Sequence, residues 1–139
     1  MNSKNVVRRL TSMGSMAILL LCSILLPAAE QPKPQPKAVK LDTAGADYLR
    51  VLGGPPESIT MRSGLVVLAP GKSVGKHSTG HNEELLVVLE GQGEMSFQDG
   101  SKLDVKANYA LYCPPETEHN VTNTGTSELR YVYIVASVK

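Results

Sequence analysis

All three histidines of the chain lie where a turn meets an apolar run. His77 and His81 come just before a run that starts at residue 85, and Glu83 and Glu84 directly precede that run. His119 lies further along, at the start of a later run. Two neutral imidazoles and one carboxylate on one face form a facial triad, which leaves positions open on a divalent ion. These residue types therefore predict a site for iron, manganese, nickel or zinc. The alternative is a set of surface histidines beside a solvated acidic pair.

The elements that must position these side chains are expected to be strands. Short apolar runs are separated by Gly, Pro, Asn and Asp, which is typical of an all-β sandwich or barrel. One window, 44–52, has enough helical periodicity for one or two helical turns. The core must be built from Val, Leu, Ile and Tyr, because the chain has no tryptophan and one phenylalanine. The predicted strands are 59–68, 85–89, 93–97, 102–105, 109–112, 119–122 and 129–136.

Composition narrows the class of protein. A chain of 139 residues has room for one domain, and 42% apolar with 19% charged residues indicates a globular fold. The formal net charge of +1 argues against a nucleic-acid partner, since phosphate binders need clustered surplus Lys and Arg. Two distant cysteines do not make a disulfide framework.

The first 29 residues are typical of an export signal. Three basic residues and no acidic one precede an apolar run over 16–26, and Pro27, Ala28 and Ala29 follow it. This order matches a secretory signal, and the run is short for a membrane span of about 20 residues. We expect cleavage near Ala28 or Ala29. The mature protein is then expected in the periplasm or outside the cell, with no stable membrane insertion. The alternative is an uncleaved N-terminal anchor.

The rest of the chain divides at a proline-rich segment. Residues 30–38 contain three prolines at every second position, which predicts an extended linker. The folded domain is expected over 39–139. Loss of 1–29 would remove Cys22 and leave Cys113 alone. We interpret Cys113 as a small buried hydrophobe, with a reactive thiol as the alternative.

Two segments resemble the paired motifs of the cupin superfamily. The first, 71–91, reads GKSVGKHSTGHNEELLVVLEG, and the second, 108–123, reads NYALYCPPETEHNVTN. The resemblance implies an antiparallel β-barrel, the double-stranded β-helix or jelly roll, with a divalent metal held inside by His77, Glu84 and His119. It selects Glu84 as the inward carboxylate and leaves Glu83 in solvent. The positions that match the motifs are Gly71, His77, Glu84, Gly91, Pro114, His119 and Asn123.

The sequence departs from the cupin pattern at the second histidine, which is Thr79 here. Three arrangements follow. In the first, His77, Glu84 and His119 hold the metal and water takes the lost position. In the second, Gly80 lets His81 swing in and restore three histidines. In the third, no metal binds, as in cupins that only bind ligands.

Two glycines of the second motif are also replaced. Asn108 takes the place of one of them, and asparagine tolerates the left-handed backbone that such a turn needs. Glu116 replaces the other, from which we expect a turn that is less strained than usual.

The side chains of the barrel wall offer little acid–base chemistry. Met95, Phe97, Tyr112, Tyr131 and Tyr133 are candidates for the wall, about half of them facing inward by strand alternation. Beyond the ligands, only Glu83, His81 and Tyr112 are candidates for a general base. Arg62 lies mid-strand, and an inward arginine would favour an acidic substrate.

Two classes of function fit these residues. The first is a metal-dependent dioxygenase, or an isomerase or lyase, acting on a small oxygenated compound. The second is a non-catalytic cupin that binds a sugar or another small ligand. A homodimer is a further expectation, with strand 129–136 as its edge.

Overall fold

The computed structural model describes residues 32–138 of the chain. The predicted export signal at 1–29, with Cys22, lies outside the described residues. Within 32–138, no helix is long and apolar enough to cross a membrane. The chain over these residues consists of strands and their connections, so the predicted all-β class is confirmed.

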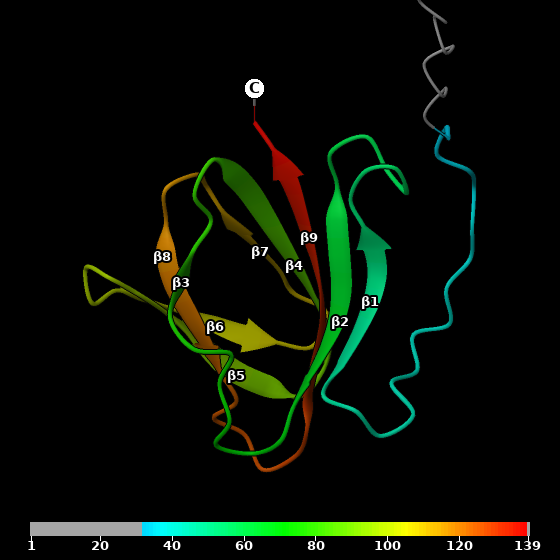
Figure 1. Cartoon of the computed structure of the whole chain (residues 1–139). Coiled ribbons are helices and arrows are strands. Elements are labelled where there is room, and N and C mark those ends of the chain that lie inside the picture. The colour runs from blue at the N-terminus through cyan, green and yellow to red at the C-terminus, as the bar shows by residue number, and fades with distance from the viewer. Residues whose placement is uncertain (1–31, 139) are drawn as a thin grey trace, which may run out of the picture. The chain divides into compact units, whose positions relative to one another are not determined.

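The strands form two antiparallel sheets that face each other (Figure 1). One sheet has the order β1-β2-β9-β4-β7, and the other has the order β3-β8-β5-β6. Consecutive strands therefore alternate between sheets at several points, as expected for a jelly-roll barrel. The strands are β1 (Tyr48–Gly53), β2 (Arg62–Leu68), β3 (His77–Ser78), β4 (Asn82–Glu90), β5 (Gln92–Phe97), β6 (Lys102–Lys106), β7 (Ala110–Cys113), β8 (Glu118–Thr122) and β9 (Leu129–Ser137).

The core lies between the two sheets and is built by strand alternation. On β4, Glu84, Leu86 and Val88 are buried while Leu85 and Leu89 are exposed, because successive side chains of a strand point to opposite faces. The other strands contribute their inward residues in the same way. The buried cluster comprises Val66, Leu68, Leu86, Val88, Met95, Val105, Leu111, Cys113, Val121, Leu129 and Tyr131.

Strand register places one row of residues across the end of the first sheet. Arg62 of β2 pairs with Val135 of β9, Val135 pairs with Glu84 of β4, and Glu84 pairs with Cys113 of β7. Directly paired residues share a face of the sheet. The buried Glu84 and Cys113 therefore show that the whole row faces the barrel interior.

Two tight connections hold the sheets in this arrangement. Gly91 joins β4 to β5 with φ +78°, and a Cβ atom there would lie 2.2 Å from the carbonyl oxygen of Glu128. Asn123 is fully buried, and its side chain donates to the carbonyl oxygens of Leu68 and Ser127, at 2.7 and 2.8 Å. These two motif residues thus have structural roles at the end of the barrel opposite the histidines.

The second-motif turns keep the backbone conformation that glycine would adopt. Asn108 has φ +69°, as its side chain permits. Glu116 has φ +57°, so the expectation of a less strained turn at this position is wrong. The backbone N–H of Glu116 donates to the carbonyl oxygen of Gly80 at 2.8 Å, which joins this turn to the β3–β4 connection.

Three expectations about strands are corrected. Residues 44–52 do not form helical turns, because β1 starts at Tyr48 and pairs with β2. The strand predicted over 59–68 begins only at Arg62. Strand β9 is not an edge, since it lies between β2 and β4. The edges of the two sheets are β1, β7, β3 and β6.

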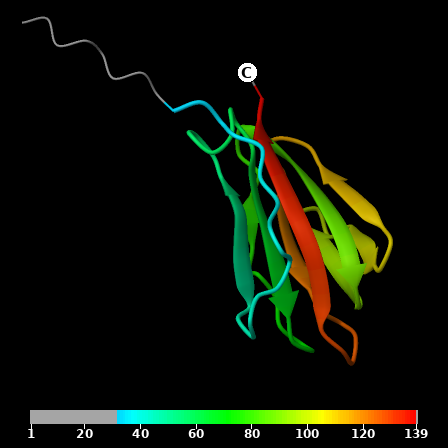
Figure 2. The same cartoon turned by 90° about the vertical axis from the view of Figure 1, so that its right-hand side faces the viewer.

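The segment before β1 runs along the outside of the larger sheet (Figure 2). Residues 32–47 contain no strand, and most of their side chains are exposed. The guanidinium of Arg130 on β9 donates to the carbonyl oxygen of Leu41 at 3.3 Å, which ties this segment to the outer face. Lys37 forms an ion pair with Glu57 at 2.8 Å.

Candidate metal centre

Three elements bring His77, Glu84 and His119 to one place inside the barrel. His77 on β3 pairs directly with His119 on β8, and their ring centroids lie 4.4 Å apart. Glu84 reaches them from β4 of the opposite sheet. One potential ligand atom from each residue lies within 4.8 Å of the others. The two chain regions that the sequence separates thus converge in the fold.

Backbone carbonyls orient both imidazoles. Nδ1 of His77 lies 2.9 Å from the carbonyl oxygen of Gly75, and Nδ1 of His119 lies 3.2 Å from that of Thr117. A carbonyl only accepts, so the hydrogen belongs on Nδ1 and the lone pair on Nε2. This is the usual outer contact of a metal-binding histidine, which fixes both tautomer and ring direction.

The buried ring nitrogen of His119 has a short contact but no hydrogen bond. Its Nε2 lies 3.1 Å from Oε2 of Glu84, yet the two atoms are not aligned for a bond, and Nε2 has no hydrogen-bond partner within 32–138. His119 is 2% exposed and Glu84 8%. Burial lowers the pKa of His119, but the Glu84 carboxylate and the Thr117 carbonyl raise it by more, so the net pKa lies above its usual value.

These features fit a divalent ion. Ligand atoms at about 2.1 Å from a metal lie roughly 3 Å apart when they are adjacent in its coordination sphere. The separation of 3.1 Å between Nε2 of His119 and Oε2 of Glu84 matches that value. A buried nitrogen without a hydrogen bond is costly, and a cation between the three residues would satisfy it. His77, Glu84 and His119 could therefore hold a metal ion.

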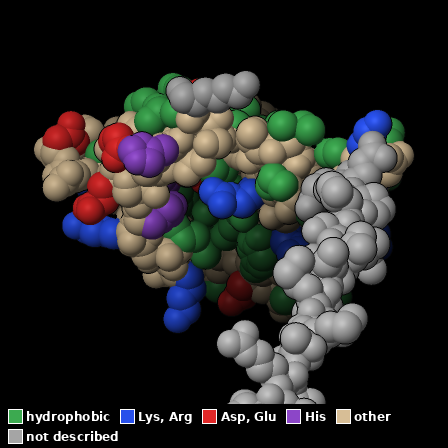
Figure 3. All heavy atoms as spheres, turned by 45° about the horizontal axis from the view of Figure 1, so that its top comes forward, with side chains coloured by type: hydrophobic (Ala, Val, Ile, Leu, Met, Phe, Trp, Pro, Cys, Tyr) green, Lys and Arg blue, Asp and Glu red, His purple; other side chains and the backbone are tan. Residues whose placement is uncertain are grey.

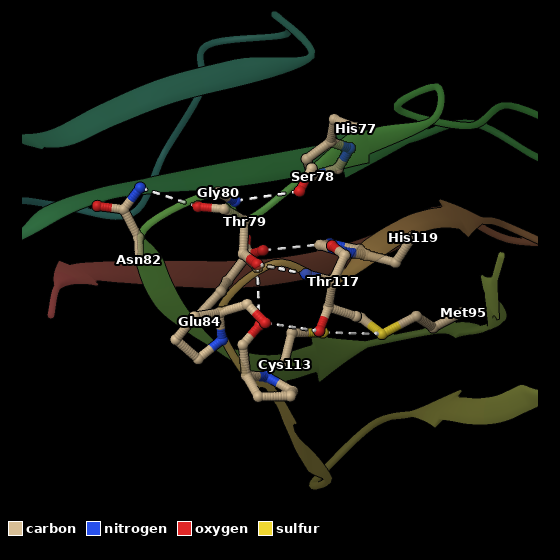
Figure 4. A network of polar contacts seen from close by, with 12 residues as sticks. His77, Ser78, Thr79, Gly80, Asn82, Glu84, Met95, Cys113, Thr117 and His119 are labelled. Carbon is tan, nitrogen blue, oxygen red and sulfur yellow. Dashed lines mark hydrogen bonds and ion pairs between the residues drawn. The ribbon is translucent and has the colours of Figure 1, made fainter.

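Thr79, at the position of the missing second histidine, is a structural residue. Its hydroxyl donates to the carbonyl oxygen of Pro114 at 2.8 Å and accepts from the N–H of Thr117 at 2.9 Å. The side chain is 7% exposed. Thr79 thereby ties the β3–β4 connection to the β7–β8 connection next to His119, as Figure 4 shows.

His81 does not join the triad. Its side chain is 95% exposed, and Nδ1 lies 2.9 Å from Oε1 of Glu116. The structure thus does not adopt the arrangement in which His81 restores a third histidine. The reason is local, because the turn at Gly80 directs residue 81 outward while Thr79 occupies the inner position.

The other candidate bases also lie outside the barrel. The hydroxyl of Tyr112 donates to Oε2 of Glu83 at 3.1 Å, and Tyr112 is 54% exposed. Tyr112 is therefore not part of the barrel wall, contrary to expectation. Its direct partner Leu85 is an outward residue of β4, so strand register alone places Tyr112 on the outer face.

The wall next to the triad is apolar. Met95, Tyr131, Phe97 and Tyr133 pack on the core as expected, and the ring of Phe97 lies 6.5 Å from that of His119. Cys113 is fully buried, as interpreted from the sequence, with Sγ 3.4 Å from Sδ of Met95. Burial and then the nearby charge of Glu84 raise the pKa of the Cys113 thiol to about 11.

Sequence reasoning missed one group near the barrel mouth. The hydroxyl groups of Tyr48 and Tyr133 lie 2.9 Å apart, and their rings stack with centroids 6.4 Å apart. Gly64 leaves room for them, because a Cβ there would lie 2.6 Å from one ring and 2.8 Å from the other. Tyr48 lies in the window 44–52, for which helical turns are predicted, so it is not expected at the barrel. A glycine inside the strand-like run 62–68 is a signal for a close approach.

This end of the domain is hollowed. The space-filling view shows histidine side chains at the edge of the hollow, hydrophobic side chains in its depth and a basic side chain beside the histidines (Figure 3). His77 is exposed while Glu84 and His119 are buried, so the triad is reached from this side.

Comparison with known proteins agrees with this architecture. A family model described as "Cupin domain" matches residues 64–135, more than half of the chain. A protein named polyketide synthase CurC, from Streptomyces cyaneus, is 31% identical over 70 residues, which cover 50% of this chain and 45% of that protein. An uncharacterised protein from Methanocaldococcus jannaschii is 40% identical over 55 residues, covering 40% of this chain and 42% of that protein. The matches thus span less than half the length of these curated relatives.

Solved structures share the fold. A protein from Bacillus halodurans has 26% identity and a TM-score of 0.64, covering 76% of this chain and 84% of that one. A Cupin 2 conserved barrel domain protein from Salinispora arenicola has 23% identity and a TM-score of 0.63, covering 75% of this chain and 91% of that one. The likeness to the Salinispora arenicola protein concerns the fold alone.

Proposed function

The chain belongs to the cupin family, and we propose that it is a metal-dependent enzyme of the dioxygenase type, acting on a small oxygenated compound. The observation that carries the proposal is the buried Nε2 of His119, which makes no hydrogen bond within 32–138, contacts only Oε2 of Glu84 at 3.1 Å, and lies with Glu84 and His77 around one point. His77, Glu84 and His119 would hold the ion. A bound divalent ion with this ligand set supplies open positions for a substrate oxygen and for dioxygen.

The choice of dioxygenase over isomerase or lyase rests on the lack of a general base inside the barrel among residues 32–138. Isomerases and lyases move a proton, which requires a group of suitable pKa within reach. Glu83, His81 and Tyr112 all lie on the outside of the barrel. Burial is the largest cause that raises the pKa values of Cys113 and Tyr131, so both stay protonated at neutral pH. The wall residues would instead exclude water and shape the space beside the triad.

The first test is metal content. We expect His77→Ala and His119→Ala to lower metal affinity by more than the roughly 10–100-fold cost of losing an outer-shell partner. Glu83→Gln and His81→Ala serve as matched controls, since both side chains lie outside the barrel, and these variants should keep their metal. The measurement is elemental analysis of protein purified without a histidine tag. Unchanged metal in both triad variants would refute the proposed site.

The alternative is a non-catalytic cupin that binds a sugar or another small ligand. The apolar wall and the hollow end of the barrel would also suit such a ligand. Ligand binding that raises thermal stability without oxygen uptake would favour this alternative. Oxygen consumption that depends on His119 would favour the enzyme.

We also propose that the protein is exported, to the periplasm or out of the cell, and that its partner is a small molecule. The support is the order of basic residues, apolar run and small residues within 1–29. N-terminal sequencing of protein recovered outside the cytoplasm should find a chain that starts near Glu30. A chain that retains Met1 in that fraction would indicate an N-terminal anchor instead.

A further inference from the structure

Arg62 is an exposed residue at the rim of the barrel, on the sheet face that carries the triad carboxylate and in the same row. It begins β2, pairs with Val135 and is followed in the row by Glu84, which lies two strands away. At about 4.8 Å between neighbouring strands, the Cα atoms of Arg62 and Glu84 are roughly 10 Å apart. An arginine side chain spans much of that distance. A small molecule could therefore contact both Arg62 and the triad.

The side chain of Arg62 is a cation without an anionic partner among the residues that the structure describes. No ion pair or hydrogen bond joins its guanidinium to another residue within 32–138, although Arg50 on the neighbouring strand pairs with Glu57 at 3.6 Å. The stem of Arg62 packs on Gly54, where a Cβ would lie 3.2 Å from Cγ of Arg62. Gly54 therefore leaves room for the arginine stem, while the guanidinium keeps all its donors available.

The tyrosine pair lies one row deeper on the same face. Tyr133 lies two residues before Val135 on β9, so both side chains point to the same face. Tyr133 pairs with Gly64 on β2. The two hydroxyl groups of Tyr48 and Tyr133 share one hydrogen bond, so one phenolic hydrogen remains to donate elsewhere.

The charges of Glu84 and Arg62 both act on Tyr133. Burial, followed by the hydrogen bond from Tyr48 and the charge of Glu84, raises the pKa of Tyr133, and the charge of Arg62 opposes this rise. Tyr133 therefore lies within electrostatic range of both Arg62 and the triad carboxylate. Its phenol stays protonated at neutral pH and can act as a donor.

We propose that Arg62 and the Tyr48–Tyr133 pair form an anion-binding subsite in the barrel mouth, so that the substrate is a small carboxylic acid. The inference rests on the proposed function, because the other end of the substrate carries an oxygen that faces the triad. A guanidinium binds a carboxylate through two parallel N–H···O bonds, and the free phenolic hydrogen supplies a third donor. Arg62 is then a specificity residue and takes no part in holding the metal.

The test compares matched acids and amides. The probes are malonate, succinate and glutarate, each against its monoamide, titrated into the metal-loaded full chain by calorimetry. We expect the wild type to bind at least one diacid about tenfold more tightly than its monoamide, given the strength of charge-assisted bonds. Arg62→Gln should abolish this preference, and Arg62→Lys should retain part of it, since lysine keeps the charge but loses the fork.

Controls separate this subsite from the metal site. Arg130→Gln, on the outer face of the same sheet, should leave the preference unchanged. Tyr133→Phe should weaken diacid binding by a few-fold without loss of metal. A wild type without any acid preference, or an Arg62→Gln variant that keeps it or loses its metal, would overturn the inference. A wild type that holds no metal would instead refute the proposed function.

Discussion

Thr79 connects two loops that together position His119. A hydroxyl that already donates to Pro114 and accepts from Thr117 has little capacity left for a cation. We therefore expect Thr79→Val to destabilise the fold by about 1–3 kcal/mol, because it leaves two backbone groups without a partner. Metal content should stay the same. Urea unfolding measures the first effect and elemental analysis the second.

Thr79→Ser is the matched control for this prediction. Serine keeps the hydroxyl and should restore most of the stability. If the valine variant lost its metal while its unfolding midpoint stayed at the wild-type value, Thr79 would be a ligand and the three-residue site would be incomplete.

Cys113 is the direct strand partner of the triad carboxylate, Glu84. The side chain is fully buried, and its pKa is raised to about 11, so the thiolate is scarce at pH 8. We expect a thiol reagent such as Ellman's reagent to label native protein only as fast as the protein unfolds, and to label urea-unfolded protein at once. Fast labelling of the native chain would show that Cys113 is accessible and reactive.

At the scale of elements, Gly91 allows β4 to pass into the other sheet as β5. Gly91 and Gly100 both have positive φ, at +78° and +84°, but only Gly91 faces a close neighbour. Gly100→Ala should cost about 1–2 kcal/mol from backbone strain alone. Gly91→Ala should cost clearly more, because its Cβ would overlap the Glu128 carbonyl. If chemical denaturation gave the same loss of unfolding free energy for both variants, the β4–β5 connection would be able to shift and accommodate the added Cβ.

The elements that the sequence predicts well are those whose burial alternates. Strands near β4, β5 and β9 follow from apolar alternation and flanking turns, and the spacing of His77, Glu84 and His119 in the motifs was sufficient to group them. Strand β1 was missed because its sequence also fits a helical period. Only pairing with β2, a long-range contact, decides between the two.

Long-range contacts also explain the misplaced side chains. Tyr112 was expected inside, yet its register against Leu85 directs it outward. Strand β7 is too short for its sequence to show which of its side chains point inward. The inward position of Arg62 likewise depends on pairing across β9 to Glu84, which no local pattern encodes.

At the scale of the whole molecule, metal binding should stabilise the fold, because the three ligands come from both sheets. A ligand at 100 times its dissociation constant adds about 2.7 kcal/mol. For a domain of this size, that corresponds to a shift in Tm of roughly 10–20 °C. Treatment with a chelator should therefore lower the Tm of the wild type by this amount and leave His77→Ala unchanged. An equal shift in both proteins would mean that the chelator acts elsewhere.

The segment before β1 provides the last prediction, which concerns the domain boundary. Residues 32–38 are exposed and include the surface ion pair from Lys37 to Glu57, and exposed ion pairs of this kind are worth at most about 1 kcal/mol each. A chain that starts at residue 39 should therefore unfold with nearly the same free energy as one that starts at residue 30. A chain that starts at residue 48 also loses the bond between Arg130 and the Leu41 carbonyl and exposes more of the outer face, so it should be clearly less stable. Equal stability of all three chains in urea would show that residues 39–47 lie outside the folded domain, which would then begin at β1.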